Sequence, residues 1–113
     1  MKVAVACEGK QVSQHFGHCE GFEMYDVQDQ KVVGQEYVVS PGHKPGFLPV
    51  FLKGIQADVI IAGGMGEAAK DLFLENGIDV VVGVQGNCDE IVSMYALGQL
   101  EFTGEICKEH HHD

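Results

Sequence analysis

Two short apolar runs constrain this chain most, because each is followed by a glycine-containing loop and then by a helical pattern. Residues 58–62 read DVIIA and residues 79–84 read DVVVGV, so both runs are rich in β-branched side chains and lack polar alternation. Strands of this kind are typical of parallel sheets that are covered on both faces. Helices must therefore pack on each side of them, and the sequence predicts an α/β domain.

The rest of the chain supplies three more strands and three helices. We predict strands at residues 2–7, 22–27 and 31–39, of which the last two form a hairpin because their link is short and polar. Helices are predicted at residues 48–55 and 67–75, with a third from the N-cap Asn87 to Gly98. The order β-β-β-α-β-α-β-α favours a five-stranded mixed sheet between helical layers, a three-layer ribonuclease-H-like fold.

The helical periodicity also predicts which side chains enter the core. In residues 67–75, the stripe of Ala69, Leu72 and Phe73 lies with Met65 on one face. In the last helix we expect Ile91, Met94 and Tyr95 to point inward.

Length and charge limit the class of protein. The 113 residues predict one domain over residues 1–104, followed by a flexible Cys/His-rich tail over residues 105–113. No apolar run approaches the roughly 18 residues of a membrane span, and the first strand does not read as a signal peptide. A cytoplasmic protein without membrane partners is expected. The net charge of −10 argues against binding nucleic acid.

Candidate ligands gather where the predicted parallel strands end. Ligands of open α/β sheets bind outside the carboxyl ends of the strands. If the first strand runs parallel to the two apolar runs, these features share one edge: the candidate metal ligands Cys7, His15, His18, Cys19 and Cys88, and the loop of Gly63, Gly64, Met65 and Gly66. In the tail, Cys107 and His110 are weaker metal candidates, since a Cys/His tract can bind divalent metal.

Each of these residues also has an ordinary structural interpretation. Free cysteines often fill core space, and glycines after a strand often serve tight packing. The glycine loop opens a helix whose amides would attract an anion, but it lacks the G-x-G-x-x-G spacing of a nucleotide site. No carboxylate cluster of a two-metal nuclease can be assembled on the strands, so catalysis is the weaker interpretation.

Three segments together resemble a known family. They are MKVAVACEGKQVSQHFGHCEGFEMYDV, DVIIAGGMGEAAKDLFLENGIDVVVG and the final ALGQL, and they extend from Met1 to about Thr103. The V-S-x-H-F-G and G-G-M-G-x-x-A patterns within them are similar to those of the dinitrogenase iron–molybdenum cofactor biosynthesis family, which includes NifX, NafY and the carboxy-terminal domain of NifB.

The resemblance implies a non-enzymatic protein that binds or carries an iron–sulfur or Fe/Mo-type metal–sulfur cluster. It implies a cofactor-binding role for His15, the histidine of the H-F-G motif, facing the glycine loop of residues 63–66. Many relatives have an arginine after this motif, whereas this chain has His18 and Cys19, which shifts the preference toward direct metal coordination. Cluster donor and acceptor proteins would be the partners, and the carrier is expected to be a monomer or weak homodimer.

Two other functions stay open. The first is a regulatory module that binds a small anion or nucleotide at the glycine loop. The second is a hydrolase with a degenerate ribonuclease-H-type site.

Overall fold

The computed structural model describes residues 1–42, 46–100 and 106–107, the last pair for its backbone only. None of the helices in these ranges is long and apolar enough to cross a membrane. The strands are β1 (Lys2–Glu8), β2 (Gln11–Val12), β3 (Gly21–Gln28), β4 (Lys31–Val39), β5 (Val59–Ile61), β6 (Asp79–Val81) and β7 (Ile106–Cys107). The helices are α1 (Phe47–Gly54), α2 (Glu67–Glu75) and α3 (Cys88–Ala96), with the short 3-10 turn η1 (Phe16–His18) between β2 and β3.

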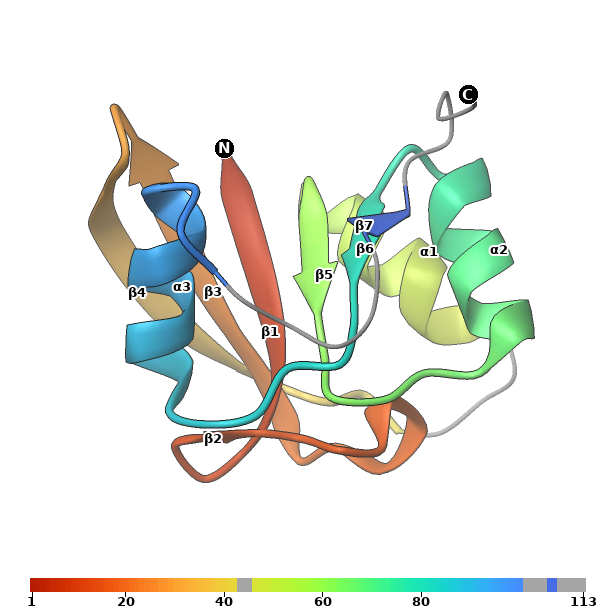
Figure 1. Ribbon diagram of the computed structural model, residues 1–113. Coiled ribbons are helices and arrows are strands. Elements are labelled where there is room, and N and C mark those ends of the chain that lie inside the picture. The colour runs from red at the N-terminus through yellow and green to blue at the C-terminus, as the bar shows by residue number, and fades with distance from the viewer. Residues whose placement is uncertain (43–45, 101–105, 108–113) are drawn as a thin grey trace.

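One mixed sheet organises the molecule, with the strand order β4-β3-β1-β5-β6-β7. β1, β5 and β6 are parallel to one another, while β3, β4 and β7 are antiparallel to their neighbours. β2 pairs with the end of β1, and its Gln11 also forms an isolated bridge with Asn87. The carboxyl ends of β1, β5 and β6 therefore lie at one edge of the sheet, the lower edge in Figure 1.

The alternation of side chains along β1 divides the core in two. Ala4 and Ala6 face α1 and α2, where they pack in a cluster with Leu52 and Phe73. Val3, Val5 and Cys7 face the other way, against α3 and its buried Ile91 and Val92. Helices thus cover both faces of the sheet, as the two apolar runs predict (Figure 1).

The predicted hairpin is confirmed, and its turn explains its register. Asp29 and Gln30 both have left-handed backbones, with φ of 52° and 66°. A two-residue turn with positive φ at both positions matches the twist of the flanking strands. β4 then covers residues 31–39 as predicted, although the pairing with β3 shifts register between Asp26 and Val27.

Three details of the prediction need correction. The sheet contains the two-residue strands β2 and β7 in addition to the five strands expected. β6 ends at Val81 and not at residue 84. The chain turns soon after it, since Gly83 has φ of 82°. In α3, Met94 is 38% exposed, and Val92 is the residue that joins Ile91 in the core.

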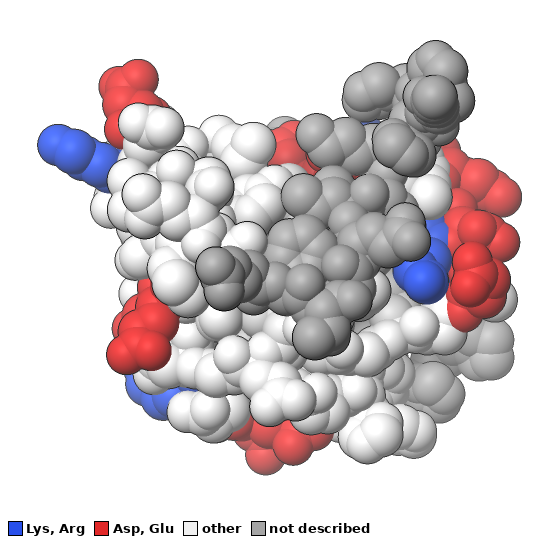
Figure 2. Space-filling view, in the orientation of Figure 1, with Lys and Arg blue, Asp and Glu red and all other residues white. Residues whose placement is uncertain are grey.

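The acidic composition appears on the surface as separate groups of Asp and Glu side chains around the visible face (Figure 2). Only one salt bridge links described residues, between Lys70 and Glu67 on α2 at 3.9 Å. Because Glu67 is exposed and the pair lies on the surface of one helix, it adds little to stability.

Candidate functional site

The loop between β1 and β3 lies across the carboxyl edge of the sheet. The left-handed Gly9 (φ 63°) reverses the chain after β1, so that Val12 pairs with Cys7. The amide of Val12 donates to Gly86 O at 2.9 Å, and the amide of Cys88 donates to Lys10 O at 2.9 Å. The loop is therefore joined to the segment that leads from β6 into α3.

The same loop contacts the glycine loop after β5. The amide of Gly63 donates to Ser13 O at 2.8 Å, and the amide of Phe16 donates to Gly64 O at 3.1 Å. A Cβ on Gly64 would lie 2.6 Å from the backbone oxygen of Gln14, and a Cβ on Gly63 would collide with the Gln14 side chain. Glycine is needed at residue 64 because the two loops touch there through their backbones, whereas at residue 63 the Gln14 side chain would have to move. The predicted convergence of these loops on one edge is observed.

The H-F-G motif separates an anchor from an exposed imidazole. Phe16 is buried, and its ring packs edge-on against Phe73 of α2 with centroids 5.2 Å apart. His15 is exposed just before it, and its amide donates to Ser13 Oγ at 3.2 Å. The Ser13 hydroxyl in turn donates to Glu8 Oε2 at 3.1 Å. The motif therefore fixes the backbone of His15 and leaves its side chain at the surface. His18, at the end of η1, is also exposed.

The three described cysteines lie in the core. Cys7 and Cys88 belong to the cluster between the sheet and α3, where they are at most 1% exposed. Cys19 belongs to the other cluster, on the side of α1 and α2. The cysteines predicted as thiolate ligands therefore lie on opposite faces of the sheet, Cys19 on one and Cys7 with Cys88 on the other.

The environment of each thiol determines its pKa. Burial raises the pKa of Cys19 to about 12. A hydrogen bond from the Cys88 thiol lowers the pKa of Cys7, and the same hydrogen bond, together with burial, raises the pKa of Cys88. Cys7 also donates to Gly21 O at 3.5 Å. Two of the three thiols are thus held in the neutral form, which is a poor metal ligand.

No group of three or more His, Cys, Asp or Glu side chains within residues 1–42 and 46–100 is placed to hold a metal ion. The backbone of Cys107 pairs with Val80 in β6, and its side chain lies outside the description. His110 lies outside the described residues altogether. The metal ligand set predicted from the sequence therefore stays a prediction.

A hollow of about 600 Å³ opens at this edge, between the β1–β3 loop and the segment after β6. It is lined by Gln11, Val12, Gln14, Gln85 and Gly86. Gln14 also links the two loops, because its side-chain amide donates to Val84 O at 3.2 Å. No motif in the sequence singles out these glutamines, and only their position in the two loops could have indicated them.

The start of α2 completes the edge. Its N-cap is Gly66, which has no side chain to accept a hydrogen bond from the first turn. The amides of Gly64, Met65 and Gly66 donate to no backbone acceptor among the described residues. Such amides at the positive end of a helix dipole attract anions.

These features define a small α/β domain whose loops meet at the carboxyl edge of a mixed sheet, with exposed imidazoles beside an uncapped helix start. The family model for the dinitrogenase iron–molybdenum cofactor family matches residues 1–98. The chain belongs to that family, as its motifs suggested.

Three relatives illustrate the similarity. An uncharacterized protein of Methanocaldococcus jannaschii, MJ0580, is 26% identical over 106 residues, covering 89% of this chain and 90% of its own. The crystal structure of PH0822 has 32% identity and a TM-score of 0.86, covering 91% and 95% of the two chains. The apo form of the orange protein from Desulfovibrio gigas shares the fold at 24% identity and a TM-score of 0.76, covering 95% and 96%.

Proposed function

We propose that this chain is a non-enzymatic carrier or scaffold for an iron–sulfur or heterometal–sulfur cluster, which it holds as cargo at the carboxyl edge of the sheet. His15 would be the protein ligand. The observation that carries this proposal is the contact between the H-F-G motif and the glycine loop, through the hydrogen bond from Phe16 to Gly64. That contact keeps an exposed imidazole and the uncapped start of α2 on one edge.

The groups at this edge suit a cluster that arrives already assembled better than a cluster built on protein thiolates. Cys7, Cys19 and Cys88 are buried. The accessible groups are therefore an imidazole, which can bind a metal, and backbone amides, which can donate hydrogen bonds. Iron–sulfur clusters are usually held by several thiolates. A cluster that brings its own sulfides needs fewer, because amides such as those of residues 64–67 can donate hydrogen bonds to sulfide.

Weak attachment agrees with a carrier role. One imidazole, with His18 three residues later as a second, would hold a cluster loosely enough to pass it to an acceptor protein. We further propose that the domain is of the ribonuclease-H-like type without nuclease activity, on the strength of the strand order β4-β3-β1-β5-β6. It would act in the cytoplasm, as a monomer or weak homodimer, between a cluster donor and an acceptor.

Anaerobic reconstitution with iron and sulfide, followed by absorption spectroscopy, tests the proposal. Wild type should gain cluster bands that His15→Ala loses. Gln28→Ala, an exposed substitution on the β3–β4 hairpin at the other end of the sheet, should keep them. An absence of bands in wild type, or equal bands in His15→Ala, would contradict the proposal.

A second candidate function rests on the glycine loop alone. The uncapped start of α2 favours a small anion or a nucleotide phosphate. Calorimetric titration with inorganic phosphate and with nucleotides, in the absence of iron and sulfide, distinguishes this function. Saturable binding that persists in His15→Ala would favour it over the carrier.

A further inference from the structure

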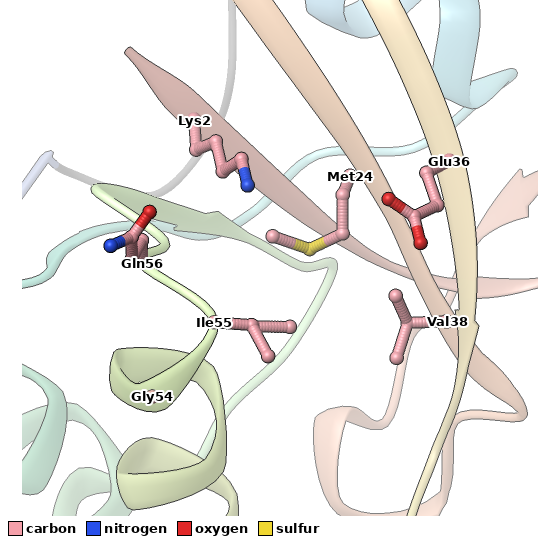
Figure 3. Close-up of a pocket in the computed structure, with 7 residues that line it drawn as sticks. All are labelled: Lys2, Met24, Glu36, Val38, Gly54, Ile55 and Gln56. Atoms are coloured by element: carbon pink, nitrogen blue, oxygen red, sulfur yellow. The ribbon is translucent and has the colours of Figure 1, made fainter.

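A second hollow lies at the opposite end of the molecule, far along the sheet from His15. It has a volume of about 290 Å³ and opens where the end of α1 meets the strands β1, β3 and β4 (Figure 3). Its lining residues are Lys2, Met24, Glu36, Val38, Gly54, Ile55 and Gln56. Nothing in the proposed carrier function uses it.

Two opposite charges face this hollow without pairing. The ammonium of Lys2 comes from β1 and the carboxylate of Glu36 from β4, and Figure 3 shows both pointing toward the space beside Met24. Neither side chain has a hydrogen-bond or ion-pair partner among the described residues. The two groups therefore form no direct ion pair with each other, and each is available to a ligand.

The floor between the two charges is apolar. Met24 is 6% exposed and belongs to the core cluster on this side of the sheet. Val38 and Ile55 are partly buried against the same cluster. In Figure 3 these three side chains line the space below the Lys2 ammonium and the Glu36 carboxylate. An aliphatic group placed there would lose contact with water on the side that faces these three side chains.

The wall supplied by α1 is polar. Gln56 lies two residues beyond the helix in the left-handed conformation, with φ of 70°. Helices often end on such a residue, and it is usually glycine because a side chain is strained there. At this position the chain instead places an amide that can both donate and accept hydrogen bonds.

We propose that this hollow binds a small zwitterion with an aliphatic side chain, which is the chemistry of an apolar α-amino acid. The ligand carboxylate would pair with Lys2, and its ammonium with Glu36. Its side chain would lie on Met24, Val38 and Ile55. The lining carries one positive and one negative side chain, so a ligand of zero net charge is the matching one. The volume is at the lower end of the roughly 300–1,000 Å³ of ligand pockets, as expected for a small metabolite.

An adjoining hollow of about 230 Å³ shares Lys2, Met24 and Glu36 and continues toward Asp26, Gly34 and Gln35. Because this extension is lined mainly by polar groups, the apolar side chain of the ligand belongs in the first hollow. The extension would hold water.

Titration with L-leucine, followed by amide NMR spectra, tests the proposal. Leucine should shift amides near Lys2, Glu36 and Gln56 in a saturable way. N-acetyl-leucine lacks the cation and leucinamide lacks the anion, so each should bind at least about tenfold more weakly. Failure of leucine to shift these amides, or equal binding of either derivative, would overturn the proposal.

Variants assign the two charges. Lys2→Met and Glu36→Gln should each weaken leucine binding about tenfold or more. The matched controls Lys53→Met and Glu75→Gln change exposed charges of the same types outside the hollow, and they should leave it unchanged. Full affinity in either test variant would exclude the proposed pairing. Because iron, sulfide and His15 take no part, failure here is distinguishable from failure of the carrier proposal.

Discussion

Two helices begin at the same edge of the sheet, and they differ in how the amides of their first turns are capped. α2 begins after Gly66, which provides no capping side chain. α3 begins after Asn87, whose side-chain oxygen accepts a hydrogen bond from the Glu90 amide at 3.1 Å. The first turn of α3 also carries Asp89 and Glu90, whereas that of α2 carries only Glu67.

The difference indicates which helix start is available to an anion. In α3, the cap and two carboxylates already satisfy the positive end of the helix dipole, and these charges would repel a negative cargo. Asp89 is further occupied, because the Tyr25 hydroxyl donates to it at 2.7 Å. In α2, the first amides remain without a side-chain cap. We infer that the first turn of α3 is occupied by its own side chains, and that the first turn of α2 is the one available to an anionic ligand.

The largest expected effect concerns Cys88, the first residue of α3. A thiol at a helix start usually has a lowered pKa, yet burial and the hydrogen bond to Cys7 raise the pKa of Cys88. In the folded protein at pH 8, alkylation of Cys88 by iodoacetamide should be about a hundredfold slower than in urea. Mass spectrometry of the Cys88 peptide over time measures both rates. Equal rates would mean that the start of α3 is open after all.

The next effect concerns the close contact at the start of α2. Gly64→Ala should lower the free energy of unfolding by about 1–3 kcal/mol, because the new Cβ would lie 2.6 Å from the backbone oxygen of Gln14. Urea unfolding measures the change. Gly66→Ala is the control, since a Cβ there meets nothing within 4 Å; it should cost less than Gly64→Ala, at most about 1 kcal/mol, which is the difference between glycine and alanine at an N-cap. Similar losses in both variants would contradict the loop contact.

A smaller effect is expected from the cap of α3. Asn87→Ala removes the acceptor of the Glu90 amide and should cost about 1 kcal/mol of unfolding free energy. The same urea experiment applies, with Gln85→Ala as an exposed neighbour that caps no helix. A loss no larger than that of the neighbour would show that α3, like α2, does not depend on a side-chain cap.

Features encoded by local sequence were predicted well. α2 covers residues 67–75 as expected, because its apolar stripe and the Asn76-Gly77 ending are both local signals. β4 also has its predicted bounds. In α3, the buried residues are Cys88, Ile91 and Val92. The predicted set of Ile91, Met94 and Tyr95 has equally good helical spacing, so the error over Met94 was one of helix phase.

The pairing of short loop segments and the direction of individual side chains could not be predicted. β2 exists because the loop after Gly9 returns to β1, and only the fold brings Gln11 and Asn87 into a bridge. The direction of Cys7 depends on strand register, which a shift of one residue would reverse. Cys19 lies in a loop, where periodicity gives no information about its face. The cluster ligands were therefore predicted as a group, although the structure buries the thiols and exposes the imidazoles.

The substitution with the smallest expected effect on stability also tests most directly whether the uncapped start of α2 binds the cargo. Gly66→Asp gives α2 the side-chain cap that α3 already has, and the backbone of residue 66 (φ −71°, ψ 159°) suits a capping residue. The gain in unfolding free energy should be only a few tenths of a kcal/mol, because glycine is already tolerated at an N-cap. Nevertheless, the new carboxylate would occupy the first amides of α2 and repel an anionic cluster. Reconstitution should therefore lose most of its cluster bands in a protein that unfolds no more easily than wild type. Gly66→Ala adds a side chain without an acceptor and should keep those bands, so equal loss in both variants would show that space at residue 66, and not its open amides, admits the cargo.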